Sequence, residues 1–157
     1  MLDFPSVEAV GATGMTVIEW SNELKLGVPA MDAEHRHLLK LTNDFLTAAR
    51  ENAAFARLTL ILGELIARTR IHFQAEETLL DRAGYPGLAG HRAEHGRLLV
   101  EAQRLYERFQ TLDAAPEHDD LASRTLTLEA AKFLQRWLVD HILADDRPYR
   151  PYVSHLT

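Results

Sequence analysis

Residues 72–95 read HFQAEETLLDRAGYPGLAGHRAEH and contain two pairs of polar side chains at four-residue spacing. His72 pairs with Glu76 before a Gly-Tyr-Pro-Gly turn sequence, and His91 pairs with His95 after it. Residues four apart on a helix lie on the same face, so each pair can direct two donor atoms at one point. The stretch therefore predicts two helices joined by a short turn, each presenting a potential chelate.

Steps of three and four residues extend this pattern into a stripe through four segments of the chain. Its members are Met31, His35, Leu38, Thr42, Phe45 and Ala49; Leu58, Leu62, Leu65, Thr69, His72, Glu76 and Leu79; His91, His95, Leu98, Ala102, Leu105 and Phe109; and Ala130, Leu134, Trp137 and His141. Such spacing is typical of amphipathic helices and places the polar members on the buried face of each helix. Burying imidazoles and carboxylates costs free energy unless a partner binds their polar atoms. A metal ion would do so, and Asp146 after His141 completes seven candidate ligands.

The same periodicity predicts helices over about 31–50, 54–82, 88–111 and 125–143, with Asn52 as a cap between the first two. Residues 112–123 are expected to form a loop, and Pro148 and Pro151 to stop further helix. Short connections make sequential helices antiparallel. We therefore expect an all-α fold, an up-down-up-down antiparallel four-helix bundle with an irregular N-terminal arm.

The expected organisation is an N-terminal extension or arm at 1–19, the bundle at 20–152 and a C-terminal tail at 153–157. Within the bundle, His35 falls near the start of the first helix and His72 and Glu76 near the end of the second. His91 and His95 fall near the start of the third helix, and His141 near the end of the fourth. Alternating helix directions thus bring all of them to the same end of the bundle.

Composition limits the classes of function. The 157 residues fit one domain, the net charge is −6, and the basic residues are scattered, which argues against nucleic acid as a partner. No apolar run approaches the roughly 20 residues of a transmembrane helix, and we expect a cytoplasmic protein. With no cysteine, any metal must be held by nitrogen and oxygen, which suits iron but also zinc, manganese, nickel or copper.

The ordered motifs resemble the hemerythrin family in its single-domain bacterial form. They are Asp32-Ala-Glu-His35, His72-Phe-Gln-Ala-Glu76, His91-Arg-Ala-Glu-His95 and Trp137-Leu-Val-Asp-His141-Ile-Leu-Ala-Asp-Asp146, and Trp20 with Gly27 resembles the family's N-terminal arm. The resemblance runs from about Trp20 to Tyr152. A single His-x-x-x-His is common on helices, whereas seven ligands in order at fixed spacings form a specific signal.

The resemblance implies two iron ions joined by an oxo or hydroxo bridge. His91, His95 and His141 would hold one iron, His35 and His72 the other, and Glu76 and Asp146 would bridge them. Glu77 and Asp145 adjoin the two bridging candidates; helical phase favours Glu76, and the family's five-residue step favours Asp146.

The second iron keeps one open position in this family, where dioxygen binds. The implied function is reversible dioxygen carriage, storage or delivery by a protein that is not an enzyme, with an oxygen-consuming protein as a possible recipient. Alternatives are an oxygen sensor acting on a partner, a di-iron enzyme reducing peroxide or nitric oxide, and iron storage.

Three apolar residues beside the ligands, Phe73, Trp137 and Leu138, resemble the family's oxygen pocket, although ordinary core packing explains them equally well. His37, His118 and His155 lie outside the pattern and are expected to be solvated. Glu94 and Asp140, beside ligands, are expected to be surface charges rather than partners of the imidazoles.

Overall fold

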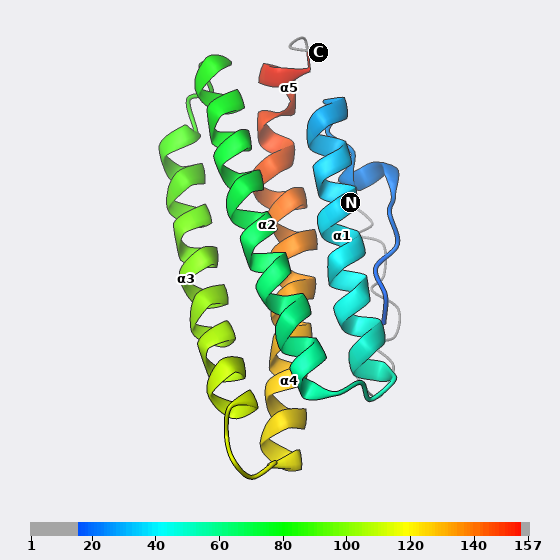
Figure 1. Cartoon of the computed structure of the whole chain (residues 1–157). Coiled ribbons are helices and arrows are strands. Elements are labelled where there is room, and N and C mark those ends of the chain that lie inside the picture. The colour runs from blue at the N-terminus through cyan, green and yellow to red at the C-terminus, as the bar shows by residue number, and fades with distance from the viewer. Residues whose placement is uncertain (1–15, 155–157) are drawn as a thin grey trace.

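Four long antiparallel helices form the body of the molecule (Figure 1). The computed structural model describes residues 16–154, and within this range it contains no β-strand. The long helices are α1 (Pro29–Arg50), α2 (Phe55–Arg82), α3 (Leu88–Asp113) and α4 (Asp120–Gln135). α1 packs on α2 and α4, and α3 packs on α2 and α4. The expected four-helix bundle is confirmed.

The predicted stripe lies in the interior, with one exception. All of its members are buried except Leu79, which is half-buried, while its neighbour Leu80 is completely covered. The main core includes an aromatic group in which Phe109 stacks on Phe55 with ring centroids 4.9 Å apart and meets Phe45 edge-on at 6.1 Å. This apolar core occupies the middle of the bundle and the end opposite the candidate ligands.

A second, smaller core closes the ligand end. It is formed by Leu26, Val28, Met31, Leu80, Tyr149 and Val153, which come from the arm, from α1 and α2 and from the C-terminal segment. Asp32 ties the arm to α1, because its carboxylate accepts hydrogen bonds from the backbone N–H groups of Leu26 at 2.7 Å and Gly27 at 3.1 Å. The end of the chain thus packs over the start of α1 and the end of α2 (Figure 1).

The fourth helix differs from the prediction at both ends. It begins at Asp120 rather than near residue 125, because the Asp119 carboxylate accepts a hydrogen bond from the N–H of Ala122 at 3.0 Å and caps the helix. Beyond α4 the chain continues through two π-helical turns, η2 (Arg136–Asp140) and η3 (Ile142–Asp146).

The expectation that the two C-terminal prolines stop the helix is wrong. A 3₁₀ turn, η4 (Arg147–Tyr149), and a short helix, α5 (Arg150–Val153), continue the helical path. Pro148 and Pro151 each stand in the first turn of one of these elements, where the missing N–H has no intrahelical partner to lose. Val153 is fully buried.

The connections also differ in detail from the prediction. Asn52 does not cap α2; it lies in the turn with a positive φ of 53°, and Ala54 precedes the helix. The arm holds one 3₁₀ turn, η1 (Asn22–Leu24), and is otherwise non-helical over residues 16–28. The predicted extension at 1–19 falls mostly outside the described residues. No helix in the described part of the chain is long and apolar enough to cross a bilayer.

Candidate metal centre

All seven predicted ligands lie in one buried cluster between the four helical segments. α1 supplies His35, α2 supplies His72 and Glu76, α3 supplies His91 and His95, and the segment after α4 supplies His141 and Asp146. None has more than 5% of its surface exposed, and the two carboxylates are completely covered. The alternating helix directions therefore bring these residues to one end of the bundle, as their positions along the helices require.

The donor atoms form two groups that share both carboxylates. The first contains Glu76, His91, His95, His141 and Asp146, and the second contains His35, His72, Glu76 and Asp146. Within each group the potential ligand atoms lie within 4.8 Å of one another. Each group could hold one metal ion, with Glu76 and Asp146 able to contact both ions.

The separations between donor atoms fit ligands that share an ion. Two atoms bound side by side at about 2.1 Å from a metal, at a right angle, lie about 3 Å apart. The Nε2 atoms of His35 and His72 are 3.0 Å apart, and those of His95 and His141 are 3.1 Å apart. Asp146 Oδ1 lies 3.1 Å from His141 Nε2. The lone pairs thus converge on spaces of the size that an ion occupies.

Hydrogen bonding alone leaves part of this cluster unsatisfied. Both oxygens of Asp146 and Nδ1 of His35 are buried without a hydrogen-bond partner among the described residues. Imidazole nitrogens come within 3.1–3.3 Å of the Asp146 oxygens but do not align as donors. A buried carboxylate without an aligned hydrogen-bond donor is costly, and a bound cation would compensate that cost. The donor set therefore fits bound metal better than it fits a structural core.

Electrostatic interactions favour the ionised forms of His72, His91 and Glu76. Burial lowers the pKa of His72, but hydrogen bonds with Glu34 and Glu76 outweigh burial and raise the pKa to about 10. Burial likewise opposes the shift at His91, yet contacts with Asp146 and Glu76 raise its pKa to about 10. Burial would raise the pKa of Glu76, but the surrounding imidazoles hold it well below its usual range. Metal binding would therefore displace protons from the imidazoles.

Three further carboxylates contact the outer nitrogens of the imidazoles. Glu34 lies 2.5 Å from His72 Nδ1, and Glu77 lies 2.8 Å from His95 Nδ1. Such contacts fix the tautomer and ring orientation of a ligand and raise its basicity.

The third of these contacts joins Asp145 Oδ2 to His141 Nδ1, at 3.2 Å. Asp145 and Glu77 are thus placed on the outer side of the imidazoles, while Glu76 and Asp146 face the cluster. Glu34 carries no signal of this role in the sequence because its partner is on another helix, whereas the four-residue step from His141 to Asp145 was a usable signal. Glu94 is half-buried and pairs with Arg97 at 2.7 Å, and Asp140 is exposed and is not among the partners of the imidazoles in the described structure.

The π-helical turns explain the five-residue step from His141 to Asp146. In an α-helix, residues five apart point about 140° away from each other. A π-helical turn has hydrogen bonds that reach five residues, so residues at this separation come onto the same side. η3 therefore directs Asp146 into the cluster and Asp145 toward its edge, which an α-helical pattern could not predict.

Aromatic side chains pack against the cluster. Phe73 stacks on His95 with ring centroids 3.6 Å apart, and Trp137 meets Phe73 edge-on at 5.7 Å. Leu138 is also buried. The predicted oxygen-pocket residues are therefore in the interior, two of them beside a candidate ligand, and their role in ligand binding stays a prediction.

A buried tyrosine also contacts the cluster, and no sequence pattern pointed to it. The Tyr149 hydroxyl donates a hydrogen bond to Glu76 Oε2 at 3.0 Å, from a side chain with no exposed surface. Burial and the nearby carboxylates raise the pKa of this phenol far above its usual range, so it stays protonated. Tyr149 and Tyr152 both stand in a proline-rich segment, where no periodic signal distinguishes one from the other.

Two of the three histidines outside the pattern are placed as expected. His37 is exposed, and His118 is exposed and pairs with Asp120 at 2.9 Å. His155 lies outside the described residues.

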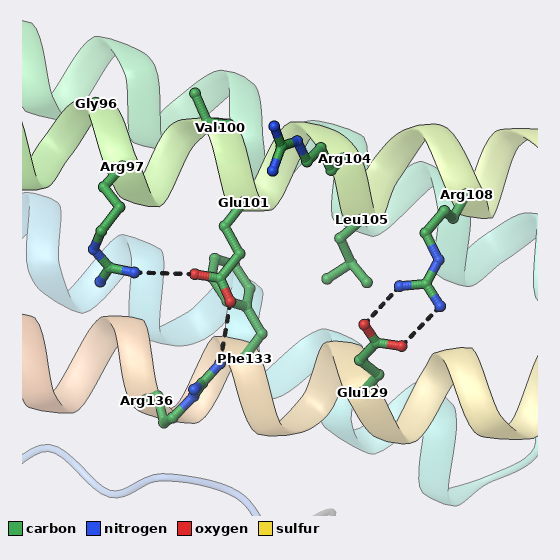
Figure 2. Close-up of a pocket in the computed structure, with 10 residues that line it drawn as sticks. All are labelled: Gly96, Arg97, Val100, Glu101, Arg104, Leu105, Arg108, Glu129, Phe133 and Arg136. Carbon is green, nitrogen blue, oxygen red and sulfur yellow. Dashed lines mark hydrogen bonds and ion pairs between the residues drawn. The ribbon is translucent and has the colours of Figure 1, made fainter.

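A surface groove between α3 and α4 is separate from this centre (Figure 2). It has a volume of about 600 Å³, and its lining includes none of the seven ligand candidates. Arg108 pairs with Glu129 at 2.6 Å, and Glu101 lies between Arg97 and Arg136 at 3.3 and 3.2 Å. A smaller hollow of about 180 Å³ on the same side reaches His141 and Trp137. The larger groove is thus a paired ionic surface, while the smaller one borders the cluster.

The fold and the cluster together define a class of metal-binding four-helix bundles, in which ligands project inward from facing helices. The chain belongs to the hemerythrin family. The family model described as "Hemerythrin HHE cation binding domain" matches residues 26–153. The resemblance seen in the sequence is thereby confirmed.

Individual relatives agree with this assignment. The chain is 29% identical over 143 residues to the bacteriohemerythrin of Stenotrophomonas maltophilia, covering 90% of this chain and 86% of the relative. It is 32% identical over 133 residues to that of Ralstonia nicotianae, covering 85% and 86% respectively. A crystal structure of wild-type hemerythrin superimposes with a TM-score of 0.74 at 26% identity, covering 88% of this chain and 99% of that one.

Proposed function

We propose that this protein binds dioxygen reversibly at a pair of iron ions, as a carrier or store. The observation that carries the proposal is the pair of donor groups that share Glu76 and Asp146. Membership of the hemerythrin family and the similarity to proteins named bacteriohemerythrin support iron and dioxygen as the metal and the ligand.

The two groups differ in the number of protein ligands. His91, His95 and His141 with the two carboxylates offer five donors to one ion, whereas His35 and His72 with the same carboxylates offer four to the other. The ion at His35 and His72 would therefore have one protein donor fewer, and this free position would be where dioxygen binds.

A bound iron pair would supply the electrons that dioxygen takes up on binding, and the residues around it would determine whether that step is reversible. Five imidazoles give a donor set richer in neutral nitrogen than the carboxylate-rich Glu-x-x-His sets of other di-iron bundles. Fewer anionic donors stabilise oxidised iron less. The ligands of this chain therefore favour return to the reduced state over further oxidation chemistry.

Apolar side chains line the interior beside both donor groups. The Phe73 ring lies between them, with its centroid 5.9 Å from that of His72 and 3.6 Å from that of His95. Trp137 meets Phe73 edge-on, and Leu138 is buried in the main core. Water would promote loss of the bound ligand as superoxide, so an apolar lining favours release of intact dioxygen. We propose these three side chains as the lining of the oxygen pocket.

The test is a visible spectrum of anaerobically iron-loaded, reduced protein as oxygen is admitted and removed in repeated cycles, with iron per chain counted alongside. We expect two irons per chain and a charge-transfer band that forms and disappears with each cycle. A single, irreversible oxidation would contradict reversible binding. Many turnovers of peroxide or nitric oxide with an added reductant would favour the enzyme alternative instead.

A matched pair of variants links the result to the cluster. Glu76→Gln removes a shared carboxylate charge with little change in volume and should reduce iron to one ion per chain or fewer. Glu64→Gln makes the same change at an exposed position of α2 and should leave two. Equal iron content in the two variants would contradict the proposed site.

A further inference from the structure

The two shared carboxylates have different surroundings. In the described structure, the polar side-chain contacts of Asp146 are all with imidazoles of the proposed ligand set, at 3.1–3.3 Å. Glu76 accepts a hydrogen bond from the Tyr149 hydroxyl, a group that lies outside the proposed ligand set. The difference is built into the fold, because Tyr149 is completely buried and comes from η4, which packs over the ligand end.

The hydrogen bond is directed at one particular oxygen of Glu76. Oε1 lies on the side of the three-histidine group, 2.5 Å from His91 Nε2 and 3.2 Å from His95 Nε2. Oε2 lies on the other side, 3.3 Å from His72 Nε2 and 3.6 Å from His35 Nε2. Tyr149 therefore contacts the oxygen that faces the two-histidine group.

Metal binding would leave this contact as the main one to Glu76. An imidazole nitrogen that binds a metal is deprotonated and cannot donate to a carboxylate. The contacts of Glu76 with His35, His72, His91 and His95 would then run through the ions. Among the interactions that the structure describes, Tyr149 would be the remaining hydrogen-bond donor to this carboxylate.

We infer that Tyr149 is a positioning residue that makes the two metal positions unequal, by holding Glu76 and withdrawing charge from Oε2. A carboxylate oxygen that accepts a hydrogen bond donates less electron density to its metal. The ion at His35 and His72, where the proposed function puts the free position, is then stabilised in its reduced state. The inference rests on the proposed function, because it assumes that the two groups bind metal.

The Tyr149 ring is held independently of its hydroxyl. It meets Tyr85 edge-on with centroids 6.1 Å apart and His91 at 5.6 Å, and it packs in the small core with Leu26 and Val153. Removing the oxygen alone should therefore leave the ring in place. This makes Tyr149→Phe a test of the hydrogen bond rather than of packing.

The experiment compares Tyr149→Phe with Tyr85→Phe, both loaded with two irons per chain. Tyr85 packs against the Tyr149 ring, but no hydrogen bond from its hydroxyl to a candidate ligand occurs in the described structure. We expect a lower midpoint potential of the iron pair in Tyr149→Phe and about tenfold faster iron release to a chelator. Tyr85→Phe should match the wild type in both. Circular dichroism and urea unfolding of the metal-free forms check that both variants fold.

A second substitution tests the direction of the effect. Replacing Tyr149 with 3-fluorotyrosine makes the phenol a stronger donor at nearly constant shape, so the midpoint potential should rise instead of falling. A structural role alone predicts no such reversal, and this substitution also serves if Tyr149→Phe fails to fold. No rise with 3-fluorotyrosine, or a Tyr149→Phe variant equal to Tyr85→Phe, would overturn the inference while the proposed function stands. A wild-type chain that binds no iron pair would overturn the proposed function and the inference together.

Discussion

The two ends of the bundle use the same helical stripe in opposite ways. At the far end, positions of the stripe carry Phe45, Leu62 and Phe109, which bury apolar surface and stabilise the fold without any ligand. At the near end, the same phase carries His35 and Glu76, whose burial costs free energy until their charges and lone pairs are satisfied. The apolar end thus supplies the stability that a preformed but unsatisfied ligand cluster requires.

Removing the metal should have the largest effect, and it should be confined to the near end. At free metal concentrations about 1,000 times the dissociation constant, each bound ion adds about 4 kcal/mol to stability. Urea unfolding with and without chelator measures this difference. Hydrogen exchange should show lost protection around residues 72–76 and 91–95 and retained protection around Phe109. A uniform loss of protection along all four helices would contradict the division into two ends.

Phe109→Ala should have the opposite distribution. Phe109 is fully buried between Phe45 and Phe55, so its truncation leaves a cavity and should cost about 3–5 kcal/mol in the free energy of unfolding. The cost should be similar with and without metal, and iron per chain should stay at two. Loss of iron from a folded variant would show that the far end also determines the ligand geometry.

Glu34→Gln should have a smaller effect, on metal affinity. The substitution weakens the contact with His72 Nδ1, which orients this imidazole toward the cluster. Such changes typically reduce metal affinity about tenfold or more, equivalent to about 1.4 kcal/mol. Competition with a chelator of known affinity measures it, with Glu64→Gln as the control. An unchanged affinity would show that the contact of Glu34 with His72 does not affect metal binding.

His37→Ala should have the smallest effect. His37 is exposed and points away from the cluster, although it is only two residues from His35. Stability should change by no more than about 0.5 kcal/mol, and neither iron content nor colour should change. A large loss of iron would contradict the placement of α1 relative to the site.

Periodic features of the chain can be recognised in the amino-acid sequence alone. The stripe of three- and four-residue steps predicted the bundle, which the fold confirms, and the ordered ligand motifs predicted a family that the matching model confirms. The motifs also identified the seven side chains that cluster at one end of the bundle, although their binding of iron stays a proposal. The boundaries proposed for the arm and the tail likewise stay predictions.

The sequence by itself therefore determined the fold and the clustered side chains at four-residue spacing, because helical phase depends only on spacing along one helix. Its ordered motifs determined the family and, through the resemblance, pointed to Asp146. Tertiary structure decided the contacts between segments far apart in the chain, such as Glu34 with His72 and Tyr149 with Glu76. It also showed the π-helical turns that direct Asp146 rather than Asp145 inward. These features depend on how segments pack against one another, and the spacing of residues along one helix does not determine that packing.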